Sequence, residues 1–245
     1  MTINPAKHIP NTLTLINLVI GCLSIVSAFE GNLLLAGYLI LIASVFDYLD
    51  GFAARMLKAY SPLGKELDSL SDLVSFGVAP SVILFHLLKE ALGIPLGEGF
   101  TNGHALLAIP FLIAAFSALR LAKFNIDTRQ TTSFIGLPTP ANALFIAGLV
   151  LGLNSPHAAW FEIIGLSPTA LIVLILVLSG LLVSPIPMFS LKMKGFIFRD
   201  MWQQYLLIAL AVITILALGI ASLAPVILLY ILISVVSWPF GKTTR

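Results

Sequence analysis

The stretch DYLDGFAARMLKAYSPLGKELDSLSD, residues 47–72, places four aspartates in two segments that are otherwise apolar enough for a membrane. One segment covers about residues 33–56 and the other about residues 66–88. An ionised carboxylate at mid-membrane costs about 2.5 to 3.5 kcal/mol on insertion scales. Such a group of acidic side chains therefore needs a compensating partner. The four are Asp47, Asp50, Asp68 and Asp72.

Helical spacing predicts that these carboxylates share one cleft. With 100° between successive residues, the first helix carries a polar and small-residue face about 140° wide. This face holds Asp47, Asp50, Gly51, Ala54 and Arg55. On the second helix, Gly64, Asp68 and Asp72 are four apart and form a stripe. The link over residues 57–63 is short enough to make the two helices antiparallel neighbours.

Carboxylates gathered in this way predict a divalent metal site. Hard oxygen ligands suit Mg²⁺ or Mn²⁺, and two such ions about 4 Å apart can clamp a phosphoryl group during displacement. Gly51 and Gly64 would let a ligand approach closely, and Arg55 would supply a cation for phosphate oxygens. Two alternatives stay open: an ion path lined by the acids, and a packing role for the small residues at a helix contact.

The amino-acid composition indicates an integral membrane protein. Of its 245 residues, 59% are hydrophobic and 10% are charged, whereas soluble domains usually carry about 25% charged residues. The net charge of +2 and the dispersed basic residues argue against nucleic acid as a partner. The first apolar run is longer than a signal-peptide core and lacks a clear cleavage site, so we expect a retained helix.

Long uncharged runs predict an all-α, polytopic membrane bundle of about eight transmembrane helices. Besides the two acidic segments, runs over residues 8–29, 99–119, 130–161 and 163–191 can each hold a span. The run over 201–241 is long enough for two, with a break expected at residues 222–225. We expect a single integral membrane domain over residues 1–245, with a core at about 8–190 and an additional helix pair at about 201–240.

The distribution of basic residues predicts the orientation. Of the 13 Lys and Arg residues, Lys89 alone falls on the side opposite to the others. Under the positive-inside rule both termini, and with them the acidic cleft, lie in the cytoplasm. An outer loop is expected over residues 92–103 and a basic cytoplasmic loop over 189–200.

The run from Asp47 to Asp72 resembles the signature of the CDP-alcohol phosphotransferase family, D-x2-D-G-x2-A-R-x8-G-x3-D-x3-D, at all eight fixed positions. This resemblance implies a core of six helices, two divalent cations (Mg²⁺ or Mn²⁺), and transfer of a phosphatidyl or similar group from a CDP-linked donor to an alcohol. It further implies that Asp47, Asp50 and Asp68 are metal ligands, and that Asp72 contacts a metal and acts as the catalytic base. The residues implied at the CDP donor are Asn11, Thr14, Gly51, Ala54, Arg55 and Gly64. Asn11 has helix capping as its alternative role.

Further motifs resemble the phosphatidylserine synthase branch of the family. They are IPNTLTLINLVIGCLSI from residue 9, ALRLAKFN over 118–125, FIGLPTPANA over 134–143 and SPIPMFSLK from residue 184. They imply CDP-diacylglycerol and L-serine as substrates, at the inner (plasma) membrane of the cell. Arg120, Lys123 and Asn125 are candidates for binding the acceptor or a phosphate, with a positive-inside anchor as the alternative.

The same residues are compatible with two other functions. The chemistry could act on another acceptor, glycerol phosphate or an inositol phosphate, because relatives with those acceptors share the core. A cation-coupled transporter could instead use the four aspartates as its ion site. Members of the family are often dimers, so the resemblance also implies a homodimer.

Overall fold

The computed structural model describes residues 8–95, 105–126, 134–189 and 202–238. Apart from one short strand pair, the described elements are helices, which confirms the predicted all-α membrane bundle. The expected loops over residues 92–103 and 189–200 lie largely outside the described residues.

The first two helices form a long antiparallel hairpin. Helix α1 covers Ile9–Phe29 and α2 covers Leu33–Met56. Asn32 caps α2, because its side-chain oxygen accepts a hydrogen bond of 3.0 Å from the backbone N–H of Leu35. The two helices pack along their length, so the Asp-bearing end of α2 lies beside the start of α1.

The third long helix consists of three consecutive helical segments. Helix α3 covers Pro62–Asp72, the π-helix η2 covers Leu73–Val78, and α4 covers Ala79–Ala91. Pro80 has no N–H to donate into the preceding turn. The wider π-helical turns, which end just before Pro80, accommodate the missing hydrogen bond. The helix therefore continues through the proline.

The remaining elements complete the bundle. They are η3 Ala105–Phe111, α5 Leu112–Ile126, β1 Phe134–Ile135, α6 Thr139–Leu153, α7 Ala158–Gly165, α8 Pro168–Val183, β2 Pro187–Met188, α9 Trp202–Leu218, η5 Gly219–Ser222 and α10 Leu223–Ser237. Of these, the helices that contact α6 are α5, α7, α8, η5 and α10, whereas α9 contacts α10 and η5.

The candidate spans agree with a polytopic membrane protein. Within the described residues, five helices are long and apolar enough to cross a membrane, and the bent pair α7 and α8 would make a sixth. The charge-free run over 130–161 is not one straight span, because it contains β1, α6 and α7 in turn. The break expected at residues 222–225 occurs slightly earlier, in the 3₁₀ turn Gly219–Ser222 between α9 and α10.

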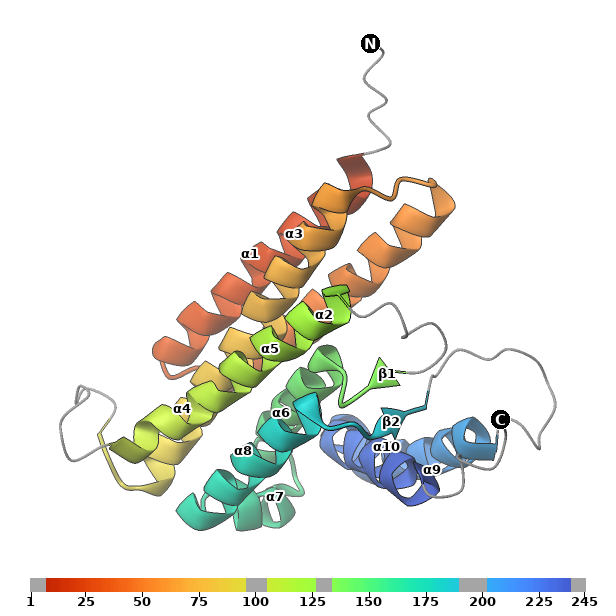
Figure 1. The fold of residues 1–245 in the computed structure, drawn as a ribbon. Helices are drawn as coiled ribbons and strands as arrows, with labels where there is room; N and C mark the ends of the chain where they lie inside the picture. The colour runs from red at the N-terminus through yellow and green to blue at the C-terminus, as the bar shows by residue number, and fades with distance from the viewer. Residues whose placement is uncertain (1–7, 96–104, 127–133, 190–201, 239–245) are drawn as a thin grey trace.

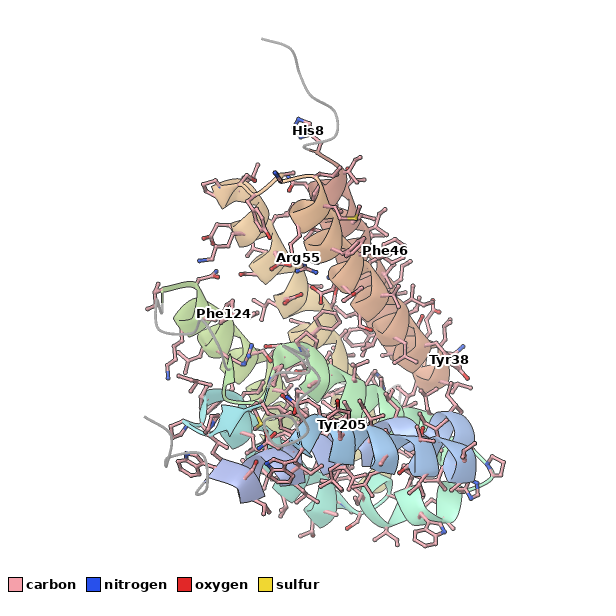
Figure 2. The ribbon with its side chains drawn as sticks, turned by 90° about the vertical axis from the view of Figure 1, so that its right-hand side faces the viewer. His8, Tyr38, Phe46, Arg55, Phe124 and Tyr205 are labelled. Carbon is pink, nitrogen blue, oxygen red and sulfur yellow. The ribbon has the colours of Figure 1, made fainter. Side chains whose placement is uncertain are left out.

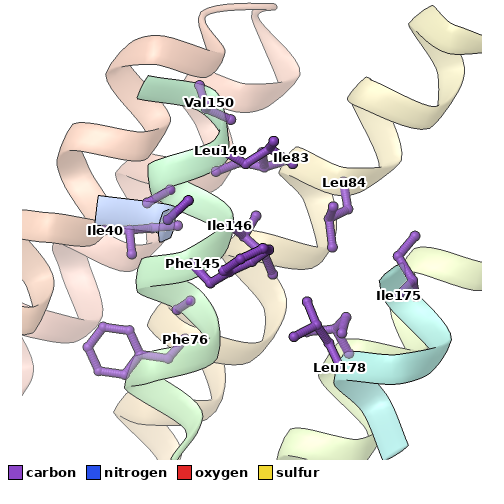
Figure 3. Close-up of a cluster of buried hydrophobic side chains, with 14 of the residues drawn as sticks. Ile40, Phe76, Ile83, Leu84, Phe145, Ile146, Leu149, Val150, Ile175 and Leu178 are labelled. Atoms are coloured by element: carbon purple, nitrogen blue, oxygen red, sulfur yellow. The ribbon is translucent and has the colours of Figure 1, made fainter. Parts of the chain in front are cut away.

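Helix α6 lies at the centre of the core. Its buried side chains Phe145, Ile146 and Leu149 belong to one hydrophobic cluster with Ile83 of α4 (Figure 3). Ile175 of α8 belongs to the same cluster. Helix α9, by contrast, has Leu207 as its one buried residue, which fits a helix whose apolar surface meets lipid.

The short strand pair was not predicted from the sequence. Strands β1 and β2 run antiparallel, with Phe134 opposite Met188 and Ile135 opposite Pro187. The pairing continues in the hydrogen bond from Gly136 N–H to the Ile186 carbonyl, at 2.9 Å. The chain between β1 and the start of α6 is thereby attached to the chain that follows α8 (Figure 1).

Candidate active site

The turn between α2 and α3 brings the two acidic helices together. Helix α2 ends at Met56, and Lys58 takes a positive φ of 50°, which turns the chain. Ser61 then caps α3 by accepting a hydrogen bond of 2.9 Å from Gly64 N–H, and Pro62 occupies the first turn. The predicted hairpin is therefore present in the structure.

Three carboxylates converge at this hairpin. One side-chain oxygen from each of Asp47, Asp50 and Asp68 lies within 4.8 Å of the other two. Asp50 is buried, and its Oδ2 accepts a hydrogen bond of 2.6 Å from the Thr14 hydroxyl group on α1. At this separation the negative charges repel one another strongly unless a cation lies between them.

Asp72 lies one helical turn after Asp68 and beside Asp47. Its side chain is buried, and its Oδ1 has no hydrogen-bond partner within the described residues. An unpaired carboxylate oxygen is costly inside a protein. A divalent cation fits these residues, because the ligand atoms are all hard oxygens and one buried oxygen lacks a partner. Asp47, Asp50 and Asp68 could thus hold a metal ion.

These acids line a pocket with a volume of about 480 Å³. All the residues expected at the CDP donor line it as well, from α1, α2 and α3. Arg120 and Asn125 line it from α5, whereas Lys123 is not a lining residue and is exposed. Figure 2 labels Arg55 of α2 and Phe124 of α5, two of the residues that line the pocket.

The two motif glycines have different surroundings. A Cβ atom on Gly64 would lie 3.0 Å from Asn11 Oδ1 and 3.1 Å from Ser61 Oγ. A Cβ on Gly51 would meet only Arg55 Nη1, at 3.5 Å, which is ordinary van der Waals contact. Gly64 therefore supports close packing between α3 and α1, in line with the helix-contact alternative.

One of the alternatives raised from the sequence is wrong. Asn11 does not cap α1, because the helix begins at Ile9 with His8 in the capping position. The Asn11 side chain instead reaches the pocket beside Gly64. Arg120 is 8% exposed, so its side chain is buried in the protein. Its Nη1 donates a hydrogen bond of 3.2 Å to Thr139 Oγ1, at the start of α6.

Sequence reasoning missed a link across the pocket between α3 and α5. Lys65 Nζ donates to the Asn125 carbonyl oxygen at 2.9 Å, and Asn125 Nδ2 donates to Ser69 Oγ at 2.9 Å. Lys65 and Ser69 both line the pocket. Because Ser61, Lys65 and Ser69 are four residues apart, they lie on the same face of the helix. That α5 would be their partner could not be inferred without the packing of the helices.

Comparison with known proteins agrees with this site. The family model for CDP-alcohol phosphatidyltransferase matches residues 7–239, and the chain belongs to this family. It is 37% identical over 159 residues to the CDP-diacylglycerol–serine O-phosphatidyltransferase of Helicobacter pylori strain J99, covering 64% of this chain and 63% of that relative. The match therefore spans less than two thirds of the length of that relative.

Two other relatives extend the comparison. The CDP-diacylglycerol–serine O-phosphatidyltransferase of Mycobacterium leprae is 32% identical over 237 residues, covering 92% of this chain and 70% of that relative. The archaetidylserine synthase of Methanothermobacter thermautotrophicus is 36% identical over 162 residues, covering 65% of each. The similarity to these relatives thus reaches well beyond the acidic motif.

Proposed function

We propose that the protein transfers a phosphatidyl group from CDP-diacylglycerol to L-serine, giving phosphatidylserine and CMP. The observation that carries this proposal is the convergence of Asp47, Asp50 and Asp68 within 4.8 Å, beside the buried Asp72 in one pocket. The printed names of the relatives support serine as the acceptor. The same core could serve glycerol phosphate or an inositol phosphate, which the experiment below distinguishes.

Residues of α1, α2 and α3 would bind the CDP donor. Arg55 provides a planar cation for a diphosphate at the exposed side of the pocket. Asn11, Thr14 and Ala54 line the neighbouring wall, and Gly51 leaves space at its pocket side. Asp47, Asp50 and Asp68, with Asp72 beside them, would hold two cations, Mg²⁺ or Mn²⁺, which when bound stabilise charge on the attacking and leaving oxygens.

Asp72 would act as the general base. In the proposed step the serine hydroxyl oxygen forms a bond to the lipid-linked phosphorus, and the bond from that phosphorus to the CMP oxygen breaks. The hydroxyl proton passes to Asp72, and CMP leaves with the bonding electrons. The buried Asp72 Oδ1, which has no hydrogen-bond partner within the described residues, supports this role. A positioned base contributes about 10²–10⁴ in rate.

The acceptor would bind at the α5 side of the pocket. Arg120 is a buried cation that lines the pocket, and its Nε has no hydrogen-bond partner within the described residues. It could therefore pair with the serine carboxylate. Asn125 lines the same side, although its amide group is already bound to Ser69. Lys123 is exposed outside this lining, so we keep Arg120 as the principal acceptor residue.

The membrane setting follows the charge pattern. We propose that the pocket and both termini face the cytoplasm of the inner (plasma) membrane, because the basic residues gather on that side. The chain would form a single domain whose six-helix core is extended by the pair α9 and α10. A homodimer stays a prediction from the family.

One experiment tests the reaction and its acceptor. Purified protein is given CDP-diacylglycerol, Mg²⁺ or Mn²⁺, and serine, glycerol phosphate or inositol phosphate in parallel, and CMP release is measured. We expect CMP release in the reaction with serine and no CMP release in the reactions with glycerol phosphate or inositol phosphate. Release with glycerol phosphate in the absence of serine would assign the second acceptor class. Ion-dependent uptake without CMP release would instead identify the transporter.

A further inference from the structure

The C-terminal helix α10 contacts the end of β2 through Tyr230. This tyrosine is 5% exposed, and its hydroxyl group donates a hydrogen bond of 3.2 Å to the carbonyl oxygen of Phe189. The two rings also pack, with centroids 4.9 Å apart and planes tilted by 59°. Phe189 directly follows β2, so α10 fixes the position where this strand ends.

The strand pair in turn fixes the chain that leads into α6. Gly136 N–H bonds to the Ile186 carbonyl and Leu137 N–H to the Leu181 carbonyl, each at 2.9 Å. Gly136 has a φ of +78°, and a Cβ there would lie 2.5 Å from the Leu182 carbonyl oxygen. Only glycine suits this close approach, so the path from β1 to Pro138 follows both the end of α8 and the residue just before β2.

The start of α6 is the part of this path that reaches the pocket. Thr139, its first residue, accepts the hydrogen bond from Arg120 Nη1. Arg120 and Asp72 both line the pocket, so the guanidinium cation and the carboxyl group share it. Arg120 is therefore bonded to the start of α6 at one end of the pocket that the acids also line.

We propose that Tyr230 is a positioning residue for the acceptor end of the pocket. Its hydroxyl group holds Phe189 and the strand pair, and these hold the Thr139 hydroxyl that orients Arg120. The assignment of Arg120 to the acceptor rests on the proposed function. Helix α10, which the proposed domain division places outside the six-helix core, thereby acquires a role in acceptor recognition.

Tyr230→Phe tests this role, because it keeps the ring and removes only the hydroxyl group. We expect the KM for serine to rise roughly 3- to 10-fold, as for loss of one hydrogen bond, while the KM for CDP-diacylglycerol stays within about 2-fold. Tyr38→Phe is the matched control, since Tyr38 on α2 is 39% exposed. Equal changes in both KM values, or behaviour like that of the control, would overturn the proposal.

Hydrogen exchange provides a readout that does not need the acceptor. Exchange at the amide of Gly136 should be at least about 3-fold faster in Tyr230→Phe than in Tyr38→Phe, because its bond to the Ile186 carbonyl oxygen beside β2 opens more often. Unchanged exchange overturns the positioning role even if serine is the acceptor. Absence of serine-dependent CMP release from the unaltered protein, by contrast, overturns the proposed function and leaves the exchange result to decide the positioning role.

Discussion

The Thr14 hydroxyl group donates a hydrogen bond of 2.6 Å to Asp50 Oδ2, which links the start of α1 to the acidic end of α2. The bond spans 36 positions in the sequence and is buried. It orients one carboxylate of the group formed with Asp47 and Asp68. Thr14 therefore acts on the predicted metal site through Asp50, in addition to lining the pocket.

We expect Thr14→Val to weaken metal binding, because Asp50 would lose the donor that orients it. Partners of metal-ligating carboxylates typically change metal affinity by about 10- to 100-fold. The Mn²⁺ concentration for half-maximal CMP release should rise accordingly. Thr14→Ser keeps the hydroxyl group and should stay near the unaltered value. The same metal dependence in both variants would contradict this role.

Asp72→Asn should remove the base while keeping the shape of the side chain. Turnover should fall by about 10²- to 10⁴-fold, and binding of the CDP-lipid should be largely retained. Single-turnover CMP release and equilibrium binding of the donor would separate the two effects. Glu66→Gln on the same helix is the control, since Glu66 is exposed. Normal turnover by Asp72→Asn would refute the assignment.

Arg120→Lys should affect the acceptor selectively. Lysine retains the charge but lacks the planar fork that can bind both Thr139 and a carboxylate. Since hydrogen bonds to charged groups contribute about 1.5–3 kcal/mol, we expect the KM for serine to rise by roughly 10-fold or more. Lys123→Ala, at an exposed position, should change it little. If Lys123→Ala has the larger effect, the acceptor site lies elsewhere.

Gly64→Ala should disturb the contact between α3 and α1. The new methyl group would press on Asn11 Oδ1 at 3.0 Å and on Ser61 Oγ at 3.1 Å. Overpacking of this kind costs about 1–3 kcal/mol, so the melting temperature and the affinity for the CDP donor should both fall. Gly180→Ala on α8 is the matched control, because its Cβ would meet nothing within 4 Å. Equal melting temperatures for the two variants would contradict the packing role.

The acidic hairpin could be predicted from the sequence because it depends on local rules. Spacings of three and four residues place Asp47 with Asp50 and Asp68 with Asp72, and the turn at Ser61 brings the helices together. Hydropathy likewise predicts membrane helices without knowledge of their neighbours. Both features are present in the structure, although the apolar run over 130–161 contains a bend that hydropathy does not detect.

Features that depend on distant partners could not be predicted. The pairing of Phe134 with Met188 joins short segments that carry no periodic signal of their own. The hydrogen bond that orients the buried Arg120 depends on α6, which supplies Thr139 from 19 positions further along the sequence. Local rules also predict a helix boundary before Pro80, whereas the π-helical turns Leu73–Val78 let the helix continue into α4.

The most direct test of the central claim is transfer of labelled serine into lipid. The unaltered protein, with CDP-diacylglycerol, should form labelled phosphatidylserine and CMP in equal amounts, lose this activity when the divalent cation is chelated, and regain it when Mg²⁺ or Mn²⁺ is restored. Asp47→Asn, Asp50→Asn and Asp68→Asn should each form far less product. Formation of labelled lipid at an unchanged rate in the chelated sample, or in those three variants, would contradict the account.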